Sequence, residues 1–369
     1  MQAARNWLLD ERKFTEISLD GNTGWQCCGS VCLPLLCVWS TTPQLTEAFV
    51  DARSKAGKLL VPVTIMLTSK LVLGLWPIAG ITTIGVTRED AKSTLLAAID
   101  VGITTFDTAY SYGYDGESDR LLGDCVRGRR DRFTIMGKVG QRWNEQRERI
   151  VDGSPKQLTL DAEASLRRMG IDSIDTLFLH QPDPHVALEA SAEAMARLQA
   201  RGICKRVGIC NASAEQVEQF AAAVPADAIQ CPLNLVQRES LVDLIQPAQS
   251  AGRDVYVYWT LMKGLLAGKI TRDHVFEKGD SRPGYAIFQG ETRRRIHDAV
   301  DRLNVLGREI DQSVAQLAVG WAISQPGVTA SLVGARREEQ IRELAGTRVL
   351  TPETLAAVER IVVECQCLA

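Results

Sequence analysis

From residue 71 to the C-terminus, short apolar runs of β-strand type alternate with longer amphipathic runs, and this alternation repeats about eight times. Such an order predicts a parallel sheet covered by helices. The predicted strands are Leu71–Trp76, Thr104–Ala109, Phe133–Val139, Thr176–His180, Arg206–Cys210, Ala228–Cys231, Val255–Trp259 and Thr329–Gly334. The predicted helices are Glu89–Val101, Glu117–Arg127, Pro155–Met169, Glu189–Arg201, Ala214–Ala223, Leu241–Ala251, Glu291–Ile310, Ser313–Ser324 and Glu338–Leu344.

Two sheet architectures fit this order, a doubly wound open sheet and a closed barrel. The open sheet most often binds nucleotides through a G-x-G-x-x-G turn after its first strand, and this sequence has no such turn. The segment 264–270 also misses the phosphate-loop pattern, because it is one residue short and has no Ser or Thr after Lys269. Eight strands suggest closure, so we expect an α/β fold, a (β/α)8 TIM barrel over about 71–350.

Composition favours a globular protein with a small-molecule ligand. The chain has 369 residues, of which 45% are hydrophobic and 24% charged, and its formal net charge is −3. The acidic and basic totals nearly cancel and no long Lys/Arg run occurs, so neither a nucleic acid nor an acidic membrane surface is the expected partner. No apolar stretch reaches the roughly 18 residues of a membrane-spanning helix. The N-terminus does not resemble a secretory signal, so we expect a cytoplasmic protein.

The first 69 residues have no sustained strand or helix period, except a weak one at 45–58. We therefore divide the chain into an atypical N-terminal extension, 1–69, and a barrel domain, 70–369. The extension is predicted to be loosely packed and dispensable for binding a cofactor. Ten cysteines are scattered along the chain without the paired spacing of a metal site, so no metal is expected. The oligomeric state does not follow from the sequence.

Four ionisable residues follow consecutive predicted strands, at the barrel end where catalysis takes place. They are Asp107 and Tyr112 after the second strand, Lys138 at the end of the third and His180 at the end of the fourth. A tyrosine hydroxyl is a poor proton donor at neutral pH unless a nearby cation favours its ionised form, and Lys138 could be that cation. The set contains no nucleophile, metal cluster or paired carboxylates, so it suits protonation of an alkoxide better than hydrolysis.

Several motifs give this chain a family resemblance. F-D-T-A-Y-S-Y-G at 106–113, G-K-V-G at 137–140, L-H-Q-P-D at 179–183, V-G-I-C-N-A-S at 207–213 and G-L-L-A-G-K at 264–269 stand in order. Together they resemble the aldo-keto reductase superfamily over about 71–360. The resemblance implies an NAD(P)H-dependent oxidoreductase acting on aldehydes, ketones or sugars. It also implies that Asp107, Tyr112, Lys138 and His180 form the catalytic tetrad, with Tyr112 as general acid and base.

The same resemblance implies a set of cofactor-binding residues. They are Asn211, Gln230, Tyr258, Thr260, Leu261, Gly334, Arg336 and Gln340. The chain departs from the family pattern where Cys210 replaces the usual Ser, Thr260 the usual Pro and Gln340 a frequent Arg. Because Arg336 could hold a 2′-phosphate through two hydrogen bonds, NADP(H) is favoured over NAD(H).

The substrate pocket is less defined by the sequence. Trp76 and Trp143 are its candidate lining residues, and the loops 143–152, 181–185 and 261–289 would set specificity. These loops are mixed in polarity, which fits a small carbonyl compound or sugar without naming one. An alternative to the enzyme is a cofactor-binding regulatory subunit of the same fold with little turnover.

Overall fold

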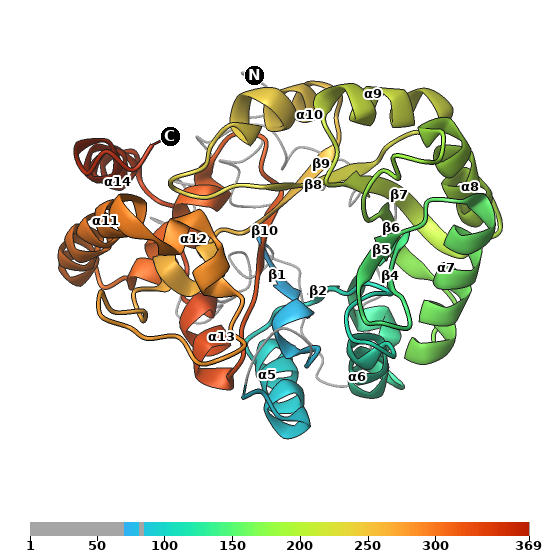
Figure 1. The fold of residues 1–369 in the computed structure, drawn as a ribbon, viewed down its shortest axis with the longest axis horizontal. Helices are drawn as coiled ribbons and strands as arrows, with labels where there is room; N and C mark the ends of the chain where they lie inside the picture. The colour runs from blue at the N-terminus through green and yellow to red at the C-terminus, as the bar shows by residue number, and fades with distance from the viewer. Residues whose placement is uncertain (1–69, 81–84, 369) are drawn as a thin grey trace, which may run out of the picture. The chain divides into compact units, whose positions relative to one another are not determined.

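Eight parallel strands close a barrel in the order β1-β10-β9-β8-β7-β6-β3-β2 (Figure 1). This computed structural model describes residues 70–80 and 85–368, so the predicted extension 1–69 lies outside the described residues. The barrel strands are β1 (Leu71–Gly74), β2 (Thr105–Asp107), β3 (Thr134–Val139), β6 (Ile174–Leu179), β7 (Cys204–Cys210), β8 (Ala228–Pro232), β9 (Asp254–Tyr258) and β10 (Ala330–Val333). The predicted (β/α)8 barrel is confirmed, with every predicted strand found within a few residues of its expected bounds.

Helices surround the barrel on its outside (Figure 1). They are α5 (Arg88–Asp100), α6 (Glu117–Val126), α7 (Pro155–Met169), α8 (Leu188–Ala200), α9 (Ala214–Ala223), α10 (Gln246–Ser250), α11 (Gly290–Glu309), α12 (Val314–Ser324), α13 (Glu338–Ala345) and α14 (Pro352–Glu364). Ser213 and Ser313 begin α9 and α12 by accepting a hydrogen bond from the third residue of each helix, whose glutamine side chain bonds back. No helix in the described part of the chain has the length and apolar character needed to cross a membrane.

Two segments differ from their predicted structure because of proline. The first strand was expected to continue to Trp76, but β1 ends at Gly74 and Trp76–Ile78 form a 3-10 turn with Pro77 inside it. The helix predicted over 241–251 begins as a π-helical turn at Leu241–Ile245 before α10. Pro247 has no N–H to close the regular bond four residues back, so the wider turn replaces it.

Two elements were missed by the sequence analysis. The loop expected over 143–152 contains an antiparallel hairpin of β4 (Gln141–Trp143) and β5 (Arg149–Val151), in which Trp143 lies opposite Arg149. The C-terminal helix α14 was also absent from the prediction. Its start has a readable signal, since Thr351 accepts a hydrogen bond from Thr354 and Pro352 occupies the first turn.

The core has two parts, which follow from the alternation of side chains along each strand. One set fills the barrel interior: Val72, Met136, Phe178, Cys210, Ala228, Tyr256, Ala330 and Leu332. Their neighbours in sequence, such as Leu71 and Leu73, point the other way and pack against the helices. Interior packing therefore closes the barrel below the carboxyl ends of the strands, and the end itself is left open for a site.

Candidate functional site

A polar ring lies at the carboxyl end of the barrel. It is formed by inward-facing side chains that follow the interior residues by two positions along their strands. Met136 is followed in this register by Lys138, Phe178 by His180, Ala228 by Gln230 and Tyr256 by Tyr258. Because the period of a strand is two, interior packing fixes where these polar groups point. The barrel itself thus places most of the site.

A buried ion pair lies at the centre of the ring. Lys138 Nζ donates a hydrogen bond of 2.5 Å to Asp107 Oδ2, and the two side chains are only 2% and 1% exposed. Gln230 Nε2 donates to the other carboxylate oxygen at 2.8 Å. Burial disfavours the charged ammonium, but Asp107 outweighs it together with Tyr112, so the pKa of Lys138 is raised. Lys138 is therefore a fixed cation.

The Tyr112 hydroxyl lies next to that cation. Lys138 Nζ is 3.1 Å from the Tyr112 oxygen and 4.7 Å from the centre of its ring. The ring also packs on Trp76 and His180, with centroid separations of 5.1 and 5.9 Å. Lys138 lowers the pKa of Tyr112 as expected, but burial has the larger effect and raises it to about 12. The expected acidic tyrosine is thus corrected to one that stays protonated at neutral pH.

His180 is a neutral imidazole that faces the same space. Burial, together with the charges of Lys138 and Arg149, holds the pKa of His180 well below its usual range. No hydrogen-bond partner for its Nδ1 is found among the residues described. A neutral histidine can donate a hydrogen bond to an oxygen without taking its proton, which suits it to orienting a carbonyl group beside Tyr112.

A cavity of about 660 Å³ opens over the ring. The four predicted catalytic residues line it, and so do all eight predicted cofactor residues: Asn211, Gln230, Tyr258, Thr260, Leu261, Gly334, Arg336 and Gln340. Trp76 lines the cavity as well. Trp143 does not, but its indole N–H donates to the Ser111 carbonyl at 2.9 Å and its ring stacks against Arg149, which does.

One side of the cavity offers amide groups. Gln230 Oε1 is buried and has no hydrogen-bond partner in residues 70–80 and 85–368. Asn211 sits in the left-handed region at φ 53° and donates to the His180 carbonyl at 2.9 Å, while its Oδ1 accepts a 2.5 Å bond from the Tyr258 hydroxyl. Cys210 beside it is a buried thiol whose pKa is raised by burial to about 12. An unpaired buried amide oxygen and a tyrosine ring that line the same cavity fit a planar carboxamide such as that of nicotinamide.

The loop before α13 also lines the cavity. The Arg336 N–H donates to Gln340 Oε1 at 2.8 Å, which fixes the loop while the Gln340 amide N–H groups remain available as donors to a phosphate. Gly334 lies against Pro77, where a Cβ would come within 2.6 Å of the proline ring. Burial and the neighbouring charges of Arg282 and Arg337 lower the pKa of Arg336. The part of the cavity around Arg336 is therefore electropositive.

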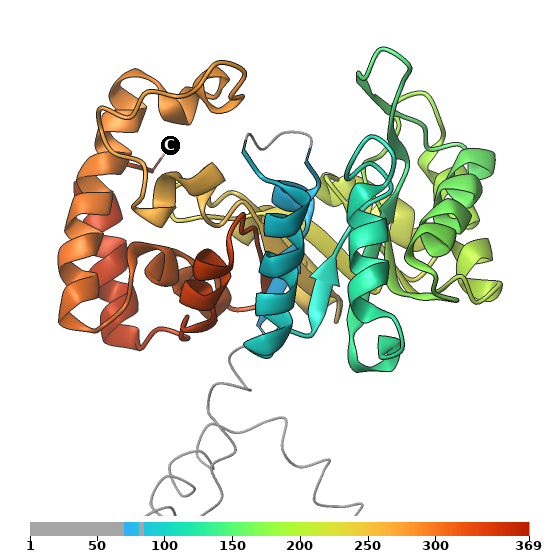
Figure 2. The same ribbon diagram turned by 90° about the horizontal axis from the view of Figure 1, so that it is seen from below.

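Several residues that line the cavity were not predicted from the sequence. Arg149 comes from the unpredicted hairpin, and Lys263, Asp280 and Arg282 come from the 261–289 span. Figure 2 shows the hairpin and this orange span rising at the same end of the barrel. Their signal in the sequence is weak, because charged residues in loops usually face only solvent.

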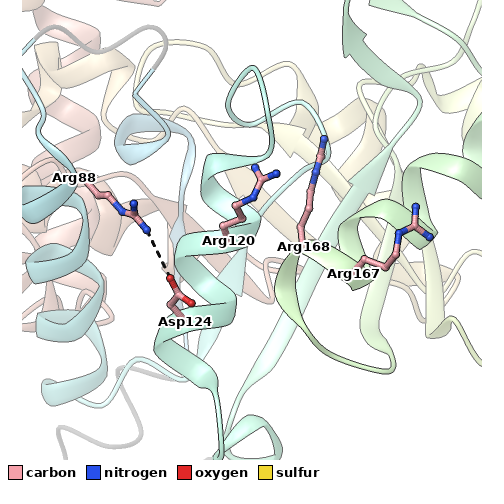
Figure 3. Close-up of a pocket in the computed structure, with 5 residues that line it drawn as sticks. All are labelled: Arg88, Arg120, Asp124, Arg167 and Arg168. Carbon is pink, nitrogen blue, oxygen red and sulfur yellow. Dashed lines mark ion pairs between the residues drawn. The ribbon is translucent and has the colours of Figure 1, made fainter.

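Outside this cavity, the described residues offer little for other chemistry. In the described ranges, no three His, Cys, Asp or Glu side chains are grouped as a metal would require. A hollow of about 430 Å³ lies outside the barrel and is lined by Arg88, Arg120, Asp124, Arg167 and Arg168 (Figure 3). Arg88 and Arg120 form exposed ion pairs, with Asp124 at 3.8 Å and Asp115 at 3.1 Å, and such pairs contribute little. Arg168 instead lies 3.9 Å from the buried carboxylate of Asp119.

Comparison with known proteins covers the same part of the chain. The Aldo/keto reductase family model matches residues 70–363. Aldo-keto reductase YhdN of Bacillus subtilis (strain 168) is 34% identical over 281 residues, covering 75% of this chain and 84% of the relative. The NADH-specific methylglyoxal reductase of Escherichia coli (strain K12) is 28% identical over 290 residues, covering 74% and 88%. The solved structure of a Gluconobacter oxydans glycerol dehydrogenase superposes with a TM-score of 0.74 at 30% identity, covering 80% of this chain and 91% of that one.

Proposed function

Because this chain belongs to the Aldo/keto reductase family, an oxidoreductase family that uses nicotinamide cofactors, we propose that it transfers hydride between NAD(P)H and the carbonyl carbon of an aldehyde, ketone or sugar. The observation that carries the proposal is the joint placement of the Tyr112 hydroxyl, the Lys138–Asp107 pair and neutral His180 around one cavity. A bound nicotinamide supplies the hydride, which no protein side chain can provide.

In this proposal Tyr112 holds the proton that the substrate oxygen receives. With a pKa of about 12, the hydroxyl is protonated at neutral pH and is still a stronger acid than an alcohol, so it can protonate the alkoxide that forms when a carbonyl is reduced. Lys138 favours the phenolate left behind, since its Nζ is 3.1 Å from that oxygen. His180 donates a hydrogen bond that positions the substrate oxygen.

We assign Asn211, Gln230 and Tyr258 to the nicotinamide end of the cofactor, and Thr260, Leu261, Gly334, Arg336 and Gln340 to its remainder. The unpaired Gln230 oxygen supports the first group. Arg336 supports NADP(H), because a guanidinium can hold a 2′-phosphate by two hydrogen bonds. The NADH specificity in the name of the Escherichia coli relative belongs to that protein, so the preference needs its own measurement. A cytoplasmic location stays a prediction from the sequence.

The decisive experiment combines cofactor titration with turnover. The purified full chain is titrated with NADPH and NADH by fluorescence and is then assayed against a panel of aldehydes and aldoses. We expect binding of at least one cofactor and steady-state reduction, with Tyr112→Phe abolishing turnover while cofactor affinity is nearly unchanged. Full activity of Tyr112→Phe, or no binding of either cofactor, contradicts the proposal.

The same experiment distinguishes an enzyme from the alternative, a cofactor-binding regulatory subunit with little turnover. A cofactor-binding subunit would oxidise its bound cofactor once and slowly, without steady-state turnover of any carbonyl in the panel. The complete set of four residues in this chain supports an enzyme over that alternative.

A further inference from the structure

Arg149 lies against two tryptophan rings at the edge of the cavity. Its guanidinium carbon is 4.7 Å from the centre of the Trp76 ring and 5.1 Å from that of Trp143. Both rings are themselves held, since Trp76 packs on Tyr112 and the Trp143 N–H is bonded to the Ser111 carbonyl. Stacking of this kind fixes the plane of a guanidinium and leaves its edge N–H groups free to bind a ligand.

The hairpin that carries Arg149 is also ordered by its own bonds. Arg149 on β5 lies opposite Trp143 on β4. The turn between them is closed by the backbone bond from Asn144 to Glu148 at 3.0 Å and by the Asn144 side chain, which accepts from the Glu148 N–H at 2.8 Å. A preorganised cation loses little freedom when it binds an anion.

Three cations of the cavity are neutralised by a carboxylate of the described residues, whereas Arg149, Lys263 and Arg336 are not. Lys138 is paired with Asp107, Arg282 with Asp280 and Lys269 with Glu343. For Arg149, by contrast, no carboxylate of the described residues lies within ion-pair distance, and the residue is exposed at the cavity. An exposed, stacked and unpaired cation is suited to bind an anionic group of a ligand.

Arg149 stands on the substrate side of the cavity. It lies in the hairpin after β3, whereas the residues assigned to the cofactor lie within or just after β7, β8, β9 and β10. Its charge acts on His180, whose pKa it helps to lower, and Trp76 links it to Tyr112. A group bound by Arg149 would therefore belong to the molecule whose carbonyl is held by His180 and Tyr112.

From this arrangement we propose that Arg149 selects carbonyl substrates that carry a phosphate or carboxylate group, binding that anion while the carbonyl oxygen meets Tyr112 and His180. The proposal rests on the proposed function above and names the substrate class of the same site. Phosphate and carboxylate share the chemistry that a guanidinium edge recognises, so substrates of both kinds are needed to distinguish them.

The test compares charged and neutral partners of similar shape. The full chain is assayed, with saturating cofactor, on 4-carboxybenzaldehyde against 4-nitrobenzaldehyde and on glyceraldehyde 3-phosphate against glyceraldehyde. For the anionic partner of at least one pair, we expect Arg149→Met to lower kcat/KM by about 10- to 100-fold, mostly through KM. The neutral partners should change by less than about threefold, and Arg149→Lys should restore part of the loss.

Arg147→Met is the matched control. Arg147 lies in the same hairpin and its guanidinium stacks 4.6 Å from the ring centre of Tyr114, but it does not line the cavity. Its removal should leave the preference for the anionic partner unchanged. Equal losses on charged and neutral partners in Arg149→Met would assign Arg149 to hairpin packing and overturn the proposal.

A binding measurement tests the anion site at Arg149 even if the proposed function fails. If no carbonyl is reduced with either cofactor, the proposed function fails, but quenching of tryptophan fluorescence by 4-carboxybenzaldehyde still reports its affinity. Weaker binding to Arg149→Met than to the unaltered chain and to Arg147→Met supports the anion site. The same affinity in all three proteins overturns it.

Discussion

The Lys138 ammonium lies 2.5 Å from the Asp107 carboxylate, at a depth where neither side chain is more than 2% exposed. Two charges at this depth stabilise each other, because each has lost its hydration and depends on the other for compensation. The pair also holds the cation that faces the Tyr112 hydroxyl. The Lys138–Asp107 ion pair therefore contributes both to the stability of the fold and to the proposed chemistry at Tyr112.

Lys138→Met should unfold at a lower denaturant concentration, because it leaves the Asp107 charge buried without its partner. The expected loss in the free energy of unfolding is about 3–5 kcal/mol. Urea unfolding measures it. The double variant Lys138→Met with Asp107→Asn should recover part of this loss, since no lone charge remains, while neither variant should reduce carbonyls. A single variant as stable as the unaltered chain would contradict the coupling.

Arg336→Met should narrow the difference in affinity between NADPH and NADH. A guanidinium bonded to a phosphate contributes enough that its loss should weaken NADPH binding by about tenfold, with NADH little affected. Fluorescence titration with both cofactors measures the ratio. Arg337→Met is the matched control, because Arg337 points to Asp90 at 3.1 Å. Equal weakening of NADPH and NADH binding would contradict the assignment of Arg336 to the 2′-phosphate.

Asp119 should make stability depend on pH in the acidic range. Burial raises its pKa to about 6 from 3.8, although the 2.7 Å hydrogen bond from the Thr108 hydroxyl opposes the shift. The folded state thus favours the protonated acid, and the stabilisation present below pH 4 is lost as the pH rises to about 6.

Asp119→Asn removes this titration. Relative to the unaltered chain, the free energy of unfolding of Asp119→Asn should rise by about 3 kcal/mol between pH 4 and pH 7. Asp124→Asn, on the exposed side of the same helix α6, is the control and should show no such rise. Unfolding in urea at a series of pH values checks both, and parallel profiles for the two variants would refute the assignment.

Gly123→Ala should destabilise the contact between α6 and α7. A Cβ at Gly123 would come within 2.3 Å of the Met169 carbonyl oxygen, which is backbone and cannot rotate away. Overpacking of this kind costs about 1–3 kcal/mol. Thermal unfolding should show a lower midpoint for this variant than for Gly284→Ala, where nothing lies within 4 Å of the added carbon. The reverse order would contradict the close packing.

The residues that were predictable from sequence are those that a strand period places. Lys138, His180, Gln230 and Tyr258 follow interior residues by two positions, and strands of this barrel expose their carboxyl ends together. Of these four, Gln230 and Tyr258 were named only through the family resemblance, although the strand period also explains their placement. Asn211 and Arg336 were named in the same way, and their loops have no period to read.

Other features depend on contacts between distant segments. The sequence of the β4–β5 hairpin has no turn signal such as Asn-Gly, so nothing indicated that Arg149 lies opposite Trp143 and against Trp76. The pKa of Tyr112 also required the structure, since burial sums over many neighbours while the sequence suggested only the single effect of Lys138.

The pairing of β1 with both β2 and β10 has a consequence for synthesis of the protein. Leu73 lies opposite Phe106 on one side and Val333 on the other, so one edge of the first barrel strand gains its partner only near the end of the chain. During translation, the ribosome releases β1 long before β10 exists. Until then, its apolar edge is open to pairing with other nascent chains, and it is at this stage that a chaperone would protect the protein most.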